Sequence, residues 1–139
     1  IEIGKQTNVQ ENCCIHVNHD EVTRIGDRVT IGHGAIVHGC DVGEGTLIGM
    51  GATVIDRAKI GSHCLVGAGA LVTGTADIPD GWLAIGSPAH AVRPLTEKEL
   101  AELESAWREY CEIGTDMESQ GLLVTGSTYS PLPCSEASR

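Results

Sequence analysis

Three histidines near the start of the chain, His16, His33 and His38, are the residues best suited to chemistry. Neutral imidazole nitrogens are preferred ligands of zinc, and three such ligands with a fourth position open are typical of a catalytic zinc site. His33 and His38 are five residues apart, a spacing that suits neither one face of a helix nor one face of a strand. Whether they can share a metal ion therefore depends on the fold that positions them.

A six-residue repeat predicts that fold. Aliphatic residues recur at almost every sixth position through residue 78, and a glycine often follows. Such a period is typical of a parallel β-helix, in which three short strands and three turns form a coil of about eighteen residues. The predicted coils span residues 3–24, 25–41, 42–59 and 60–77. The aliphatic positions are Ile3, Val9, Ile15, Ile25, Ile31, Val37, Val42, Ile48, Val54, Ile60, Val66, Val72 and Ile78.

The composition agrees with a narrow core of this kind. The chain has no Phe, and stacked coils bury one aliphatic side chain per strand, so Ile and Val can fill the interior. The predicted fold class is all-β, a parallel β-helix that occupies residues 1–94 together with a connecting segment. In that segment Pro88 and Pro94 cannot sit inside regular strand ladders, so we expect irregular structure there.

A single C-terminal helix is predicted over residues 95–113. Thr96 is a suitable N-cap, and Glu99 three residues later completes a capping box. An apolar stripe at helical spacing predicts that the helix packs on the β-helix or on a neighbouring subunit. The stripe consists of Leu100, Leu103, Trp107 and Tyr110 or Cys111. Residues 114–139 are polar, rich in Gly and Ser and without pattern, so we expect a disordered tail.

Composition also excludes some partners. The formal net charge of −10 argues against nucleic acid and anionic membranes, and no apolar run approaches the ~18 residues of a membrane span. Six cysteines without a CxxC motif indicate free thiols in a reducing compartment. A cytoplasmic location is the simplest choice, with a mitochondrial or plastid matrix as the alternative. Because the chain begins at Ile1 in mid-repeat, we expect further N-terminal coils in the complete protein.

The repeat register predicts that His16 and His38 are equivalent positions one coil apart. Ile15 and Val37 occupy the third strand of successive coils, and each histidine directly follows one of them. Adjacent strands lie about 4.8 Å apart, so the two imidazoles can converge on one ion. A lone surface histidine is usually just a solvated side chain, but two in one register column favour a shared ligand.

His33 belongs to the preceding strand of the coil that contains His38, so its side chain points around a corner. It cannot easily reach the same ion within one subunit. A threefold ring resolves this, because the edge that carries His16 and His38 then faces the neighbour's edge that carries His33. We therefore predict a homotrimer with a three-histidine site at each interface and a fourth position left for water.

Four segments carry a resemblance to a known family. NVQENCCIHV, VTIGHGAIVHGC, IGMGA, and GSPA followed by an arginine resemble the gamma-class carbonic anhydrases, over residues 3 to about 100. The resemblance implies a left-handed β-helix, a homotrimer, and zinc, with iron or cobalt as alternatives, bound by His16, His33 and His38. It also implies that Asn8 and Gln10 are polar groups near the metal-bound water.

The resemblance further implies the reversible hydration of carbon dioxide to bicarbonate by metal-bound hydroxide. The family's Arg-Gly-Asp segment is absent from this chain, and its acidic loop with a shuttle glutamate is not recognisable. The short insertion near residues 19–24 offers only Asp20 and Glu21 in place of that glutamate. Two alternatives stay open because fold does not fix function. One is a hexapeptide-repeat acyltransferase that uses acetyl-CoA, with one histidine as general base. The other is a non-catalytic assembly subunit that retains the metal site.

Overall fold

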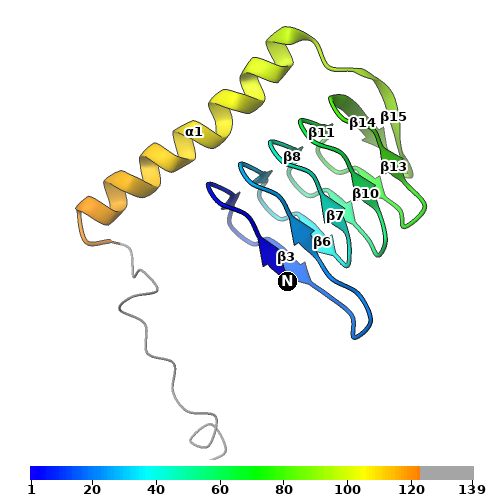
Figure 1. Cartoon of the computed structure of the whole chain (residues 1–139), viewed down its shortest axis with the longest axis horizontal. Helices are drawn as coiled ribbons and strands as arrows, with labels where there is room; N and C mark the ends of the chain where they lie inside the picture. The colour runs from blue at the N-terminus through cyan, green and yellow to red at the C-terminus, as the bar shows by residue number, and fades with distance from the viewer. Residues whose placement is uncertain (123–139) are drawn as a thin grey trace, which may run out of the picture.

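The structure, a computed structural model, describes residues 1–122 and is a parallel β-helix followed by one α-helix (Figure 1). Each coil contains three short strands separated by turns, so the predicted fold class is confirmed. The strands are β1 (Glu2–Ile3), β2 (Asn8–Val9), β3 (Cys14–His16), β4 (Arg24–Ile25), β5 (Thr30–Ile31), β6 (Ile36–His38), β7 (Asp41–Val42), β8 (Leu47–Ile48), β9 (Thr53–Val54), β10 (Lys59–Ile60), β11 (Leu65–Val66), β12 (Leu71–Val72), β13 (Asp77–Ile78), β14 (Trp82–Gly86) and β15 (Ala89–Pro94). The helix is α1 (Glu97–Ser119).

Three sheets form the sides of the β-helix, because each strand pairs in parallel with its equivalent in the next coil. Sheet A is β1-β4-β7-β10-β13, sheet B is β2-β5-β8-β11-β14 with β15 at its edge, and sheet C is β3-β6-β9-β12. The register aligns equivalent aliphatic residues, such as Ile25 with Val42 and Ile31 with Ile48. The repeat in the sequence therefore predicted the register correctly.

The core is a column of aliphatic side chains inside the β-helix. From β4 to β13 the inward residue of every strand is buried, and Val37 and Val54 have no exposed surface. Ile3 and Val9 of the first coil are 48% and 44% exposed, because described residues pack against only one side of that coil. Burying each such aliphatic side chain contributes about 1.5–3 kcal/mol, so the stacking of coils is the main source of stability.

The predicted irregular connector is wrong. β14 pairs in parallel with β11, and β15 runs back antiparallel to β14, with Gly86 opposite Ala89. Pro88 lies in the turn between these strands, and Pro94 is the last residue of an edge strand, so neither has to donate a hydrogen bond within the sheet. The two prolines therefore fit a hairpin that extends sheet B.

The start of α1 matches the prediction. The Thr96 side chain accepts a hydrogen bond from the Glu99 backbone N–H, and the Glu99 carboxylate accepts one from the Thr96 backbone N–H. Arg93 of β15 hydrogen-bonds the same carboxylate and is the main reason why the pKa of Glu99 lies well below its ordinary value.

No helix within residues 1–122 is both long enough and apolar enough to cross a bilayer.

The end of α1 differs from the prediction. The helix continues through Gly114 to Ser119, although residue 113 was its expected limit. One glycine inside a helix costs only about 1 kcal/mol, which is too little to end it. The predicted disordered tail therefore begins too early at 114, and its part from 123 to 139 lies outside the described residues.

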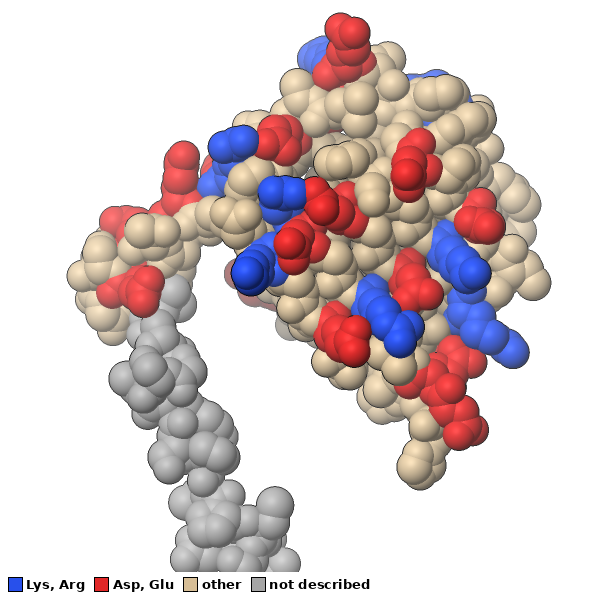
Figure 2. All heavy atoms as spheres, viewed as in Figure 1, with Lys and Arg blue, Asp and Glu red and all other residues tan. Residues whose placement is uncertain are grey.

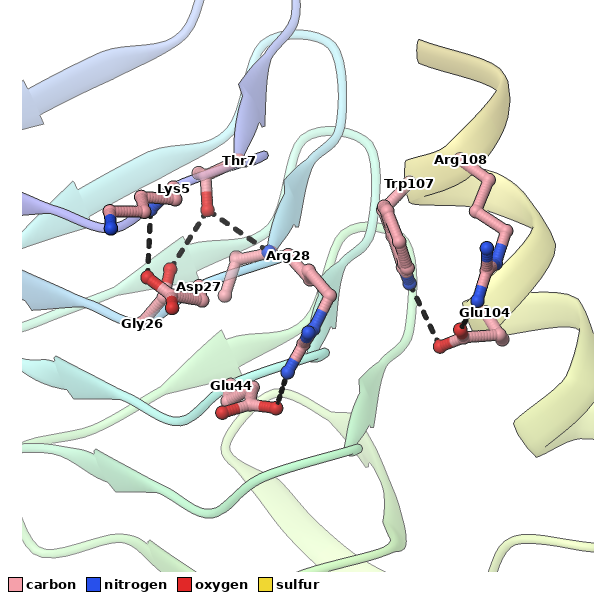
Figure 3. A network of polar contacts seen from close by, with 10 residues as sticks. Lys5, Thr7, Gly26, Asp27, Arg28, Glu44, Glu104, Trp107 and Arg108 are labelled. Atoms are coloured by element: carbon pink, nitrogen blue, oxygen red, sulfur yellow. Dashed lines mark hydrogen bonds and ion pairs between the residues drawn. The ribbon is translucent and has the colours of Figure 1, made fainter. Parts of the chain in front are cut away.

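α1 packs beside the turns that join sheets A and B (Figures 1 and 3). Leu103 and Trp107 of the predicted stripe are buried, whereas Leu100 is 37% exposed. The Arg28 guanidinium lies 5.8 Å from the centre of the Trp107 ring, and the Trp107 indole N–H donates a 2.9 Å hydrogen bond to Glu104. The helix therefore docks through Leu103 and Trp107, and Trp107 also contacts Arg28.

Replacing Trp107 by alanine is expected to destabilise the protein by about 3–5 kcal/mol, because it opens a cavity under α1 and removes the contact with Arg28. Chemical denaturation followed by circular dichroism measures this loss. The control is Glu109→Ala, at an exposed position of the same helix, which should change stability by less than about 0.5 kcal/mol. Equal losses in both variants would show that Trp107 does not anchor the helix.

The outward positions of sheet A are charged, whereas those of sheets B and C are not. The outward positions of sheet A alternate in sign along the register, and Arg24 lies 3.4 Å from carboxylate oxygens of both Glu2 and Asp41. In Figure 2 acidic and basic side chains lie close together on the face that carries β7 and β10 in Figure 1. The outward positions of sheet A are Glu2, Arg24, Asp41, Lys59 and Asp77. Those of sheet C are Cys14, Ile36, Thr53 and Leu71, with His16 and His38 at the ends of β3 and β6. Those of sheet B are Asn8, Thr30, Leu47, Leu65 and Leu83.

Candidate metal centre

His16 and His38 form a close pair at the ends of β3 and β6. The parallel register places the two residues opposite each other, as the repeat predicted. His16 Nδ1 lies 2.9 Å from His38 Nε2, and the ring centroids are 5.0 Å apart. The register of β3 with β6 thus brings two ring nitrogens together at the carboxyl ends of these strands.

His33 lies in the turn between β5 and β6, at the amino ends of the sheet C strands and so on the opposite side of the sheet from the pair. Its Nδ1 is 2.8 Å from Glu11 Oε2 of the preceding coil, and its side chain is 47% exposed. Within residues 1–122 of a single chain, no three His, Cys, Asp or Glu side chains form a group that could hold a metal ion. The structure therefore brings two of the three predicted ligands together and places the third across sheet C.

Asp56 belongs to this site, although the sequence analysis did not single it out. It follows β9, and its Oδ1 is hydrogen-bonded to His38 Nδ1. Its Oδ2 accepts a 2.9 Å hydrogen bond from Asn18 Nδ2. The register held a signal for this residue, since it aligns position 56 with Gly39, the neighbour of His38, in the preceding coil.

Glu11 is a second carboxylate that the sequence analysis missed. The register aligns it with His33, one coil later, so the repeat contained this signal too. Its oxygen at 2.8 Å favours a proton on His33 Nδ1 and leaves Nε2 with a lone pair. Carboxylates that contact the remote nitrogen of a metal-binding histidine orient its ring and raise its basicity.

Thr23 links the backbone segments that carry the histidine pair. Its side chain is fully buried, donates a 2.6 Å hydrogen bond to the His16 carbonyl and accepts a 2.8 Å hydrogen bond from the Gly39 backbone N–H. A buried hydroxyl with both partners in place stabilises the arrangement of the groups that it joins. Thr23, at the end of the insertion before β4, therefore holds together the backbone that follows each histidine of the pair.

Asn8 and Gln10 lie on either side of Val9. The Gln10 Oε1 accepts a 3.1 Å hydrogen bond from the backbone N–H of His33. Asn8 Nδ2 donates a 2.9 Å hydrogen bond to Thr30 Oγ1, and Asn8 Oδ1 is buried with no hydrogen-bond donor among the described residues. The structure thus brings Gln10, but not Asn8, into contact with one of the predicted ligand residues.

Two cysteines of the β-helix, Cys40 and Cys64, are buried thiols. The thiolate is the form that binds metals, and burial raises the pKa of the Cys40 thiol to about 12. Burial also raises the pKa of Cys64. The side chains whose donor atoms come together at this centre are the imidazoles of His16 and His38.

Comparisons with known proteins identify the family of this chain. Residues 39–74 match the family model described as bacterial transferase hexapeptide (six repeats). Over 119 residues the chain is 40% identical to gamma carbonic anhydrase 1, mitochondrial, of Arabidopsis thaliana, a match that covers 81% of the chain. It is 42% identical over 119 residues to a "probable carbonic anhydrase" of Methanocaldococcus jannaschii, covering 86% of the chain and 75% of that protein. The chain belongs to the gamma-class carbonic anhydrase family.

The match to this gamma-class carbonic anhydrase family is partial in length. The chain spans 43% of the Arabidopsis protein. A solved structure from Anaplasma phagocytophilum, described as a hexapeptide transferase family protein, superposes with a TM-score of 0.77 and 37% identity, covering 88% of the chain and 69% of that structure. A protein described as a transferase therefore has a fold similar to that of this chain.

Proposed function

We propose that this chain hydrates carbon dioxide reversibly to bicarbonate at zinc sites between the subunits of a homotrimer. The observation that carries the proposal is the His16–His38 pair, whose ring nitrogens lie 2.9 Å apart at the carboxyl ends of the sheet C strands, while His33 lies at their amino ends. Membership of the gamma-class carbonic anhydrase family supports the same reaction.

The donor atoms of the pair suit zinc. Two nitrogens bound at ~2.0–2.1 Å to a tetrahedral ion lie roughly 3.3 Å apart, so the 2.9 Å between His16 Nδ1 and His38 Nε2 needs only a small adjustment. Neutral imidazoles with oriented rings are typical of catalytic zinc sites, and His33 would complete the three. Imidazole donors also suit other first-row metals, so iron and cobalt are alternatives.

The arrangement of sheet C supports a trimer. The His16–His38 pair lies at the carboxyl ends of the sheet C strands, and His33 lies beyond their amino ends. A ring in which sheet C of each subunit faces the threefold axis would therefore bring the pair of one subunit next to His33 of its neighbour. The outward positions of sheets B and C are both uncharged, which suits burial, but only the strands of sheet C carry the His16–His38 pair at one end and follow His33 at the other. Sheet A carries the alternating charges and would face water.

The chain's own residues would have separate tasks. His16, His33 and His38 would hold the metal, which when bound acts as a Lewis acid that makes water nucleophilic near neutral pH. Gln10 would orient water or bicarbonate beside His33 without adding charge. In the net reaction one oxygen of water forms a bond to the carbon of carbon dioxide, one C=O π-bond opens to give bicarbonate, and one proton passes to solvent.

Metal content and mass of the purified protein test the proposal together. We expect about one zinc per chain and a mass of three chains, with carbon dioxide hydration above background in stopped-flow measurements. Less than about a tenth of a metal equivalent per chain would contradict the zinc site. Full zinc loading without hydration would instead favour a non-catalytic subunit that retains the site.

A hexapeptide acyltransferase is the second candidate, favoured by the family model that matches residues 39–74 and by the similarity to the Anaplasma structure. In that case one histidine would act as general base and the pairing of His16 with His38 would have no catalytic meaning. A rise in melting temperature with acetyl-CoA, but not with zinc, would favour this reading.

The cellular compartment is part of the proposal. Cys13, Cys14, Cys40, Cys64 and Cys111 are all free thiols in the structure. Free cysteines are typical of reducing compartments, which supports the cytoplasm, with a mitochondrial or plastid matrix as the alternative.

A further inference from the structure

Beyond the three ligands, we propose that Asp56 is a positioning residue that fixes His38 with its Nε2 lone pair free for the metal. This inference rests on the proposed zinc site, but its first consequence concerns the metal-free chain. Asp56 would not touch metal or substrate, and its effect would pass entirely through the imidazole of His38.

The hydrogen-bond directions around Asp56 follow from elementary chemistry. An ionised carboxylate can only accept hydrogen bonds, so His38 Nδ1, which contacts Asp56 Oδ1, is the donor. His38 Nε2 then has a lone pair and must be the acceptor in its 2.9 Å contact with His16 Nδ1. In the metal-free chain one carboxylate thus sets both tautomers, with the His16 proton on Nδ1. Zinc binding through His16 Nδ1 and His38 Nε2 would displace this hydrogen bond and leave the His16 proton on its Nε2.

Asp56 is itself held in place. Its second oxygen accepts a 2.9 Å hydrogen bond from Asn18, in the insertion that follows β3. His38 and Asp56 are only 24% and 33% exposed, so water competes less for these contacts than at an open surface. Buried Thr23 fixes the other end of this insertion, and Asn18 is the side chain through which the insertion contacts Asp56.

Gly39 makes room for this contact. It follows His38 in the chain and has φ +55, a conformation that favours glycine. A Cβ atom at position 39 would lie 2.5 Å from Asp56 Oδ1 and 3.2 Å from Glu21 Oε2. The missing side chain is what allows a carboxylate of the next coil to reach back to the ring of His38.

Removal of the carboxylate should leave both tautomers of His38 available and reduce zinc affinity by about 10–100-fold, the usual effect of losing such a partner. The variants are Asp56→Ala, which removes the acceptor, and Asp56→Asn, which keeps an acceptor oxygen of the same size. Asp77→Ala is the control, since Asp77 is an exposed acid on sheet A. Circular dichroism checks that each variant is folded.

The measurements are nitrogen-15 NMR of the metal-free proteins at an alkaline pH of about 8.5, and zinc titration against a competing chelator. The wild type and Asp77→Ala should carry the His38 proton on Nδ1. Asp56→Ala should lose this preference and bind zinc 10–100-fold more weakly. Asp56→Asn should restore the tautomer and most of the affinity.

Two outcomes would overturn the proposal. One is a His38 proton that stays on Nδ1 in Asp56→Ala with zinc affinity within about twofold of wild type. The other is an equal loss in Asp56→Ala and Asp56→Asn with unchanged tautomers. If wild type binds no zinc, the proposed function fails, yet the NMR comparison still decides whether Asp56 sets the tautomer. If Asp56→Ala does not fold, Asn18→Ala tests the same point, with a smaller loss of both signals expected.

Discussion

Alanine at position 38 is expected to lower zinc affinity by on the order of a thousandfold and to reduce carbon dioxide hydration to the uncatalysed background. The substitution removes one of the two nitrogens that lie 2.9 Å apart and leaves His16 without its hydrogen-bond partner. It also leaves the Asp56 carboxylate with no imidazole to orient. Two ligands from two different subunits would then remain for each metal ion.

Zinc per chain after chelator dialysis, chelator competition and stopped-flow hydration measure these losses. The control is His90→Ala, which removes an exposed imidazole from the β14–β15 hairpin and should leave all three quantities unchanged. Chemical denaturation should show similar stability for both metal-free variants, because neither side chain belongs to the core. Retention of wild-type zinc affinity by His38→Ala would remove the basis of the proposed site.

The pairing of His16 with His38 could be predicted because it depends only on backbone periodicity. In a β-helix the register follows from the positions of inward aliphatic residues, and Ile15 opposite Val37 brings the next residues into line. The strand order of all three sheets follows from the same repeat. Features that are properties of the repeat were therefore predictable from the sequence.

Asp56 could not be predicted in the same way, although its register position could. Whether a corner side chain turns outward or back over its neighbour depends on local space, which Gly39 provides here. The hairpin of β14 and β15 escaped prediction for a related reason. A proline such as Pro94 does not fit the interior of a central strand, but it does fit the last position of an edge strand. Only the tertiary structure shows which of these positions it occupies.

Glutamate at position 36 is expected to convert the trimer to single chains and thereby abolish zinc binding. Ile36 is 41% exposed in the single chain and points outward from sheet C, so the substitution should cost little before assembly. In a ring with sheet C at the threefold axis, three carboxylates would be buried close together, which combines desolvation with repulsion of like charges. Loss of assembly would then separate His33 of each subunit from its neighbour's His16 and His38.

Sedimentation equilibrium should report one chain mass for Ile36→Glu and three for wild type, with metal analysis on the same samples. Lys59→Glu is the control, because it changes charge on sheet A and should leave both mass and zinc content unaltered. Leu71→Glu, two coils from His38 on sheet C, should repeat the effect of Ile36→Glu without a change next to the ligands. A trimer that survives both sheet C variants and keeps its zinc would mean that another face meets the threefold axis. A zinc-loaded single chain would mean that His33 is not supplied by a neighbour.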